Sequence, residues 1–252
     1  IPSLVMSDGP SGVRQEFEND SWAPIDDTTD FVSWLPSNTC LCTTWNPNLS
    51  RKFGEVLGDE ARGRGKDVIL APGINIKRTP LCGRNFEYYS EDPLLTGKIG
   101  AAMVRGIQSM RIGASVKHFA CNNKETNRKA SDSRVSERAL REIYLKGFEI
   151  VVKEADPYTI MSSYNLLNGV HTSENKDLLT GILREEWGFD GVVTTDWWTL
   201  GEHYRETKAG NDIKMGNGYP ERVLEALEKG YITREEIELC AGRILRMILK
   251  LD

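Results

Sequence analysis

Several kinds of site are disfavoured by residues that this sequence has little of. The 252 residues include only three histidines and five cysteines, and no two cysteines form a C-x-x-C pair. A zinc site built from clustered His and Cys ligands is therefore not expected. No G-x-G-x-x-G segment follows an early strand, which argues against a dinucleotide-binding fold. We accordingly expect no metal and no cofactor.

The chain also lacks a surplus of basic residues and any long apolar run. Lys and Arg number 32 against 37 Asp and Glu, a net charge of −5, which argues against nucleic acid and anionic membranes as partners. No apolar stretch approaches the ~20 residues that cross a bilayer. The odd, irregularly spaced cysteines predict free thiols and a cytoplasmic location rather than secretion. The chain opens at Ile1 without Met, so we expect a fragment whose signal region, if any, is missing.

Short apolar segments alternate with amphipathic segments along the chain. Seven strands are expected at Ser3–Met6, Thr39–Thr43, Val68–Ala71, Ala114–His118, Thr159–Ser163, Val192–Thr195 and Asp212–Met215. Helices are expected after Asn46 and Pro47 at Asn48–Gly65, at Leu94–Met110, at Glu137–Ala155 with Ser136 as N-cap, at Asp177–Trp187, and from a Thr233/Glu236 capping box towards Leu249.

This alternation predicts an α/β fold with parallel strands and right-handed crossovers. Seven strands in a chain of this length favour a (β/α)8 TIM-type barrel, irregular or incomplete at its N-terminal end, over a doubly wound sheet. We expect residues 1–252 to form a single barrel domain.

The segments that follow the predicted strands are strongly polar. Catalytic groups of a barrel gather at the C-terminal ends of its strands. Carboxylates, cations and indoles together suit a sugar, whose hydroxyls take charged hydrogen bonds and whose apolar face stacks on Trp. Phosphate recognition would instead require a Gly-rich loop at a helix N-terminus, which is not found. The strand-end residues include Asp8, Arg14, Lys117, His118, Tyr164, Asn165, Asp196 and Trp197.

Five motifs then indicate a family. They are MSDGPSGVR (Met6–Arg14), APGINIKRTPLCGRNFEYYSEDP (Ala71–Pro93), KHFACNNKETNR (Lys117–Arg128), MSSYNLLNG (Met161–Gly169) and LREEWGFDGVVTTDWW (Leu183–Trp198). In this order they closely resemble the barrel domain of glycoside hydrolase family 3, on its β-glucosidase branch. The resemblance covers nearly the whole chain and implies a retaining β-glucosidase.

The resemblance also implies a role for each matching residue. Asp196 matches the nucleophile that forms the glycosyl-enzyme, and Trp197 matches the aromatic residue that shapes the subsite beside it. The remaining matches hold the sugar's hydroxyls or the nucleophile: Asp8, Arg14, Arg84, Lys117, His118, Arg128 and Tyr164. We expect the surrounding cations to lower the pKa of Asp196 and keep it ionised.

Some of these residues also have an alternative, purely structural explanation. Lys117 and His118 could be a strand-end salt bridge and a packed imidazole, and Tyr164 could simply cap a core. The other tryptophans are expected to pack rather than to stack on sugar: Trp22, Trp34, Trp45, Trp187 and Trp198.

Two other branches of the family fit less well. The xylosidase branch resembles a Glu-Ala-Leu-His-Gly pattern where this chain has SDGPSG, and it tends to place Cys where this chain has Trp197. The N-acetylglucosaminidase branch carries an Asp-Ser-His triplet, whereas the nearest match here is Asp132-Ser133-Arg134. A β-glucoside or oligosaccharide is therefore the expected substrate.

Retaining hydrolysis needs a second carboxyl group about 5–5.5 Å from the nucleophile to donate a proton. The resemblance implies that this acid/base is a Glu on an α/β sandwich domain, which follows the barrel in some members and precedes it in others. No matching Glu is found in these 252 residues, so a partner domain is expected to supply it. The alternative function is a noncatalytic sugar-binding barrel fragment.

Overall fold

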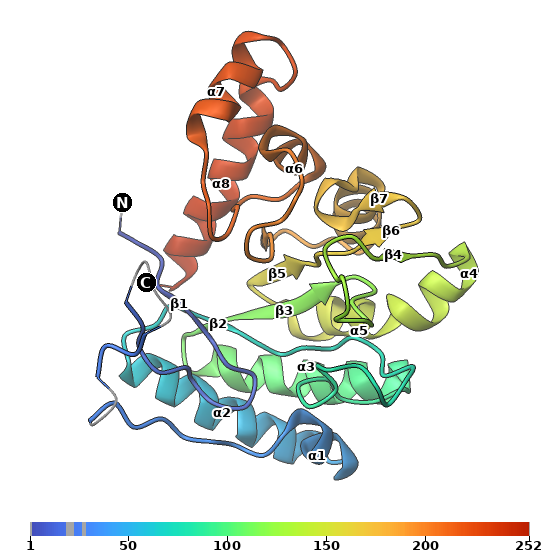
Figure 1. Ribbon diagram of the computed structural model, residues 1–252. Coiled ribbons are helices and arrows are strands. Elements are labelled where there is room, and N and C mark those ends of the chain that lie inside the picture. Colours follow the sequence, from blue (N-terminus) through green and yellow to red (C-terminus); the bar gives the residue numbers. More distant parts are fainter. Residues whose placement is uncertain (1, 19–22, 27–28, 252) are drawn as a thin grey trace.

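A parallel sheet forms the centre of the fold (Figure 1). The structure, a computed structural model, describes residues 2–18, 23–26 and 29–251. Five strands pair in the order of the chain: β1 (Met6–Asp8), β2 (Val68–Leu70), β3 (Gly113–Phe119), β5 (Thr159–Ser162) and β8 (Val192–Thr194). A parallel bridge between Thr194 and Ile213 carries the ladder one step beyond β8.

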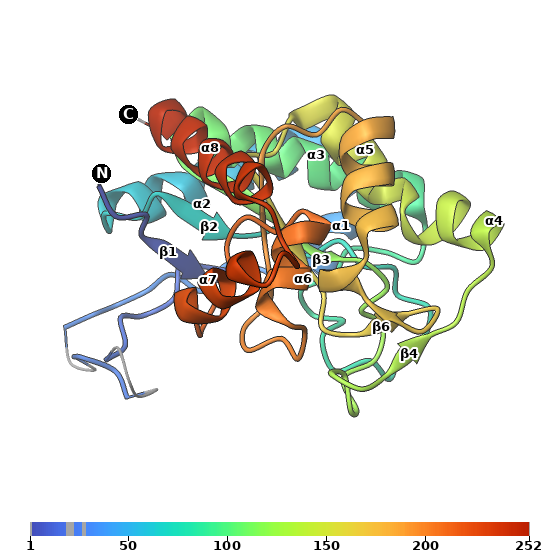
Figure 2. The ribbon, with the colours of Figure 1, turned by 90° about the horizontal axis from the view of Figure 1, so that it is seen from above.

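Strand order distinguishes a barrel from a doubly wound sheet, in which the order reverses near the middle of the sheet. Here all four strand pairs are parallel and the order never reverses, so the α/β class is confirmed and the strand order is that of a TIM-type barrel rather than of a doubly wound sheet. The first strand, β1, has only three residues, all partly exposed. Leu251 of the last helix, α8 (Arg234–Leu251), and Met6 of β1 both pack against a small cluster of Val68, Leu70 and Met161; both elements are labelled in Figure 2.

Alternation along the strands separates an outer core from an inner one. Ile69, Val116 and Ile160 belong to the main core under the helices, whereas Leu70 and Met161 belong to a smaller inner cluster. Three helices lie side by side along the outer face (Figure 1): α2 (Pro47–Gly63), α3 (Pro93–Ser109) and α5 (Lys146–Ala155).

The helix starts follow from local side-chain hydrogen bonds. The Asn46 side chain accepts from the backbone N–H of Leu49 at 3.2 Å, and Ser136 accepts from that of Ala139 at 3.3 Å. Thr233 and Glu236 bond reciprocally at 2.9 and 3.2 Å, as the predicted capping box requires.

The expected strand Thr39–Thr43 is wrong, because these residues belong to helix α1 (Asn38–Thr43). Ser37 accepts a hydrogen bond from the Cys40 backbone N–H at 3.2 Å and begins the helix. The segment is apolar at Leu41 and Cys42, which are buried. A five-residue window with this pattern fits either period, so the cap decides the structure.

Other boundaries also differ from expectation. The first strand begins at Met6 rather than Ser3, and the expected strand Asp212–Met215 contributes only the bridge at Ile213. The expected helix Glu137–Ala155 consists of α4 (Glu137–Ala139), the π-helical turn η1 (Leu140–Tyr144) and α5. The expected helix Asp177–Trp187 is the π-helix η3 (Asp177–Glu186).

Several short elements have no counterpart in the sequence-based prediction. They are a second sheet of β4 (Asp132–Ser133), β6 (Leu166–Leu167) and β7 (Val170–His171), the 3₁₀ turn η2 (Thr172–Glu174), and the helices α6 (His203–Ala209) and α7 (Pro220–Glu228). No helix in the part of the chain that the structure describes is both long and apolar enough to span a bilayer.

Candidate active site

A pocket of about 460 Å³ lies where the strands end. Asp8 is the last residue of β1, and Tyr164 and Asp196 each follow a strand by two residues. Lys117 and His118 lie near the end of β3 and contact Asp8 and Asp196 respectively. The structure thus brings all nine predicted site residues together. Those that line the pocket are Asp8, Arg14, Arg84, Arg128, Tyr164, Asp196 and Trp197.

Asp196 lies in the wall of this pocket with only 6% of its surface exposed. Its Oδ1 accepts a hydrogen bond from the backbone N–H of Trp197 at 2.7 Å. Its Oδ2 is buried and accepts no hydrogen bond from the described residues, although His118 Nε2 lies 3.8 Å away. The Tyr164 hydroxyl is directed at the same carboxylate. One buried carboxylate oxygen is therefore left without a hydrogen bond.

Burial raises the pKa of Asp196 above the ordinary value of 3.8. The Trp197 N–H, Arg84 and Lys117 all favour the ionised form, but they do not reverse the shift. The expectation that cations lower this pKa is therefore wrong in its net direction, because desolvation outweighs them. Burial and the Asp196 charge raise the pKa of Tyr164 as well, so its hydroxyl keeps its proton and can donate.

Two carboxylates, Asp8 and Glu87, pair with the cations Lys117 and Arg84. Lys117 is 2% exposed, and its Nζ lies 2.7 Å from Asp8 Oδ1 and 3.8 Å from Glu87 Oε2. The other oxygen of Glu87 accepts from Arg84 Nε. Burial alone would raise the pKa of Asp8, but Lys117 and Arg84 lower it. Lys117 thus forms an ion pair at the strand end, and its partner Asp8 lines the pocket.

His118 is buried and fixed at both its backbone and its ring. Its backbone N–H donates to Asn75 Oδ1 at 2.8 Å, and Asn75 Nδ2 donates to its carbonyl oxygen at 2.9 Å. Its ring Nδ1 lies 3.1 Å from the Tyr88 hydroxyl. The ring is therefore held with Nε2 towards Asp196.

Aromatic rings and Arg128 form the remaining wall. The Arg128 guanidinium carbon lies 4.4 Å above the centre of the Tyr164 ring, and Arg128 also pairs with Glu125 at 2.8 Å. Trp198 lines the pocket beside Trp197. Trp198 is 40% exposed there, so the expectation that it packs is wrong.

Two further buried groups, Glu87 and Tyr88, are not among the predicted site residues, although Glu87 lies in a polar loop that is expected to follow a strand. Glu87 could have been found, because a carboxylate three residues after Arg84 is a common ion-pair spacing. Tyr88 gave no such signal, since its partner His118 is 30 residues away. The expectation that Trp34 and Trp45 pack is also wrong, because they are 88% and 75% exposed. Trp22 lies outside the described residues.

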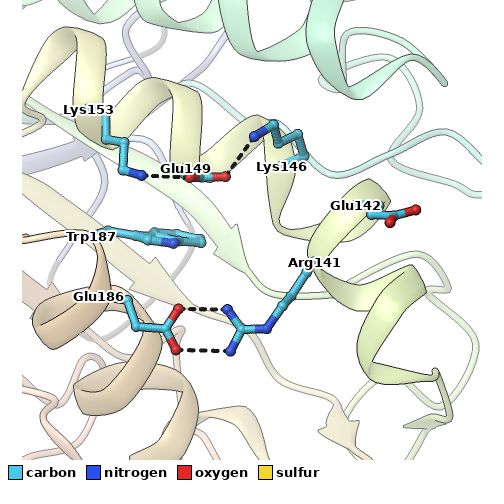
Figure 3. Close-up of a pocket in the computed structure, with 7 residues that line it drawn as sticks. All are labelled: Arg141, Glu142, Lys146, Glu149, Lys153, Glu186 and Trp187. Carbon is cyan, nitrogen blue, oxygen red and sulfur yellow. Dashed lines mark hydrogen bonds and ion pairs between the residues drawn. The ribbon is translucent and has the colours of Figure 1, made fainter.

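A second hollow of about 400 Å³ lies on the outer surface, between η1, α5 and η3 (Figure 3). Trp187 lies at its centre, Arg141 binds Glu186 through two bonds of 2.6 and 2.9 Å, and Glu149 accepts from two lysines. These charges pair with one another and lie away from the strand ends. The hollow is therefore better explained as an ion-pair network that joins the helices.

No group of three or more His, Cys, Asp or Glu side chains is placed to hold a metal ion within residues 2–18, 23–26 and 29–251. The five cysteines are free thiols. Burial raises the pKa of Cys42 to about 11 and those of Cys121 and Cys240 to about 12.

Comparison with known proteins places the chain in a family. The model of the glycosyl hydrolase family 3 N-terminal domain matches residues 1–247. β-Glucosidase A of Butyrivibrio fibrisolvens is 56% identical over 94% of this chain and 28% of its own length. An exo-α-(1→6)-L-arabinopyranosidase of Bifidobacterium longum is 43% identical over 99% of this chain and 33% of its own length.

The solved structure of β-glucosidase 3B from Thermotoga neapolitana in complex with glucose superposes with a TM-score of 0.93. It is 44% identical, and the match covers 99% of this chain and 36% of that one. The chain thus spans about a third of the length of the relatives that it matches. With the family model matched across almost the whole chain and the strand-end residues gathered around one pocket, the chain belongs to the glycosyl hydrolase family 3 N-terminal domains.

Proposed function

We propose that this chain is the nucleophile-bearing barrel of a retaining β-glucosidase, and that Asp196 attacks the anomeric carbon of a terminal β-D-glucosyl residue. The observation that carries the proposal is the buried Oδ2 of Asp196, which has no hydrogen bond from the described residues and lies in the pocket wall. Such an oxygen keeps its lone pairs for the substrate. Its raised pKa also makes the carboxylate a stronger base once it is ionised.

The other pocket residues serve the sugar. Asp8 has 42% of its side chain exposed although Lys117 holds one of its oxygens, so it can still accept from a hydroxyl. Arg14, Arg84 and Arg128 present guanidinium groups to the same space. Lys117, His118 and Tyr164 hold hydroxyls or the nucleophile, and Trp197 offers an indole for the apolar face of the ring.

We propose that the acid/base comes from elsewhere in the whole protein, because the described residues of the pocket offer no suitable donor. Besides Asp196, the carboxylates that line the pocket are Asp8 and Glu16. The pKa of Asp8 is lowered, which is unsuitable for a proton donor, and Glu16 pairs with Lys66. We therefore assign the proton donor to a Glu on an α/β sandwich domain that these 252 residues do not include.

Covalent trapping tests the proposal. Incubation with 2,4-dinitrophenyl 2-deoxy-2-fluoro-β-glucoside should add one fluoroglucosyl group on the peptide that contains Asp196. This leaving group needs no protonation, so trapping does not depend on the absent Glu. The Asp196→Ala variant should gain no mass. No adduct on the parent protein, together with glucose binding by calorimetry, would favour the noncatalytic sugar-binding function.

Two substrate series refine the result. Loss of a general acid costs about 10²–10⁴-fold, and more for a poor leaving group. The chain should therefore release dinitrophenol from its β-glucoside far faster than it cleaves cellobiose. Because one relative is named an arabinopyranosidase, dinitrophenyl α-L-arabinopyranoside should be assayed in parallel. Preferential turnover of that compound would overturn the glucoside assignment but not the nucleophile.

A further inference from the structure

A chain of hydrogen bonds, buried from Asn122 onwards, runs from Glu125 to His118. Glu125 pairs with Arg128 at 2.8 Å, and its Oε1 accepts from Asn122 Nδ2 at 3.3 Å. Asn122 Nδ2 also donates to the Tyr88 hydroxyl at 3.0 Å. An ionised carboxylate only accepts, so the amide group of Asn122 and not its carbonyl must face Glu125. The direction of the bond to Tyr88 follows from this orientation.

The Tyr88 hydroxyl has one proton to donate and, with Asn122 as a donor to it, one remaining partner. That partner is His118 Nδ1 at 3.1 Å. If Nδ1 carried a proton, Tyr88 would accept two bonds and its own O–H would be buried without an acceptor. In addition, the lone pair of Nε2 would then face the carboxylate of Asp196, 3.8 Å away. The contacts of both ring nitrogens therefore favour an unprotonated Nδ1 and a protonated Nε2.

The imidazole is neutral in this setting. Burial lowers the pKa of His118 well below 6.5, and the positive charges of Arg84, Lys117 and Arg128 lower it further. A neutral ring has one donor and one acceptor, and its tautomer decides which nitrogen faces the pocket.

We propose that Tyr88 is a positioning residue that holds His118 as the neutral Nε2–H tautomer, so that Nε2 donates to a sugar hydroxyl that lies between it and Asp196. The inference rests on the proposed function for its catalytic meaning, but the tautomer itself can be measured without turnover. At 3.8 Å the gap to Oδ2 is too long for a direct hydrogen bond. The donor is thus available when the sugar arrives.

Nitrogen NMR of protein labelled with ¹⁵N-histidine tests the inference, with the signals of His118 identified by their loss in His118→Gln. Long-range ¹H–¹⁵N correlations should show Nε2–H and a bare Nδ1 between pH 5.5 and 8. Tyr88→Phe removes the hydroxyl, so a Nδ1–H or doubly protonated population should appear. The rate of trapping at Asp196 should fall about three- to tenfold, as expected for one lost buried hydrogen bond.

Tyr89→Phe is the matched control. Its buried hydroxyl bonds to the Met103 sulfur and not to His118, so neither the tautomer nor the trapping rate should change. If Tyr88→Phe does not fold, Asn122→Leu tests the same step by removing the donor that directs Tyr88. A parent spectrum with Nδ1–H or with imidazolium would overturn the inference, as would an unchanged tautomer in both variants. Failure of trapping in the parent protein counts against the proposed function instead.

Discussion

Replacement of Lys117 by methionine tests whether a buried cation tunes the nucleophile. Lys117 is among the groups that favour the ionised form of Asp196, so its loss should raise the pKa of Asp196 further. Methionine keeps most of the apolar stem and removes the charge. In the proposed function Asp196 reacts only as a carboxylate, and the acid limb of the trapping rate should therefore move to higher pH.

The free energy of unfolding should fall by about 2–3 kcal/mol in this variant. Removal of one partner from a fully buried ion pair costs about 3–5 kcal/mol. The value is reduced here because Asp8 has 42% of its side chain exposed, so solvent screens it, and because Glu87 keeps Arg84 as a partner.

The pH dependence of this loss has a definite sign. The pKa of Asp8 is lowered in the folded protein. Its pairing with Lys117 therefore stabilises the fold above the ordinary carboxyl pKa, and this contribution disappears as the pH falls through the folded value. The difference in stability between the parent and Lys117→Met should be largest near neutral pH and should shrink below about pH 4.

Urea unfolding from about pH 2.5 to 8 and trapping rates from about pH 4 to 8 provide the two measurements. Lys214→Met is the control, because Lys214 is also a buried lysine paired with a buried carboxylate, Glu206, but is not among the groups that act on the pKa of Asp196. It should lose stability and leave the acid limb in place. An unchanged acid limb in Lys117→Met, or an equal shift in both variants, would refute the reasoning.

Three further predictions concern packing, thiols and a buried ion pair. Gly106→Ala should destabilise the protein by about 2–3 kcal/mol in urea unfolding, because its Cβ would lie 2.1 Å from a backbone oxygen of α2, whereas Gly181→Ala meets nothing within 4 Å and should cost nothing. A thiol reagent at pH 8 should label exposed Cys40 but not buried Cys42, whose pKa is raised to about 11; equal labelling by peptide mass would contradict this. Asp212→Asn should cost about 3 kcal/mol in thermal unfolding, because Asp212 is fully buried between two arginines at 2.8 and 3.0 Å.

Much of the fold could be predicted because buried parallel strands leave a strong apolar signal. Val68–Leu70, Thr159–Ser162 and Val192–Thr194 are each fully buried and fall inside the expected strands. The helix α1 could not be recognised by that signal, since the five residues Thr39–Thr43 fit a strand equally well. The π-helical turn at Leu140–Tyr144 has no sequence signature either, because it depends on how the helix packs.

The candidate site could likewise be predicted from the sequence only in part. Polar residues directly after strands could be predicted, because in a barrel the strand ends meet at one opening. The partners behind them could not. Tyr88 contacts His118, which lies 30 residues away, and Glu87 lies between Arg84 and Lys117, which are 33 positions apart. Only the folded arrangement shows which carboxylate serves which cation.

The pairing of each cation with a carboxylate other than Asp196 has a consequence for reactivity. In the described part of the chain, Lys117 pairs with Asp8, Arg84 with Glu87 and Arg128 with Glu125, and no lysine or arginine pairs directly with Asp196. A nucleophile in a direct salt bridge would be stabilised before the reaction, and that stabilisation would have to be given up in the transition state. Cations held nearby by other carboxylates keep Asp196 ionisable while its Oδ2 stays unbonded. We therefore expect that a cation moved into direct contact with Asp196 would lower its pKa and slow trapping together.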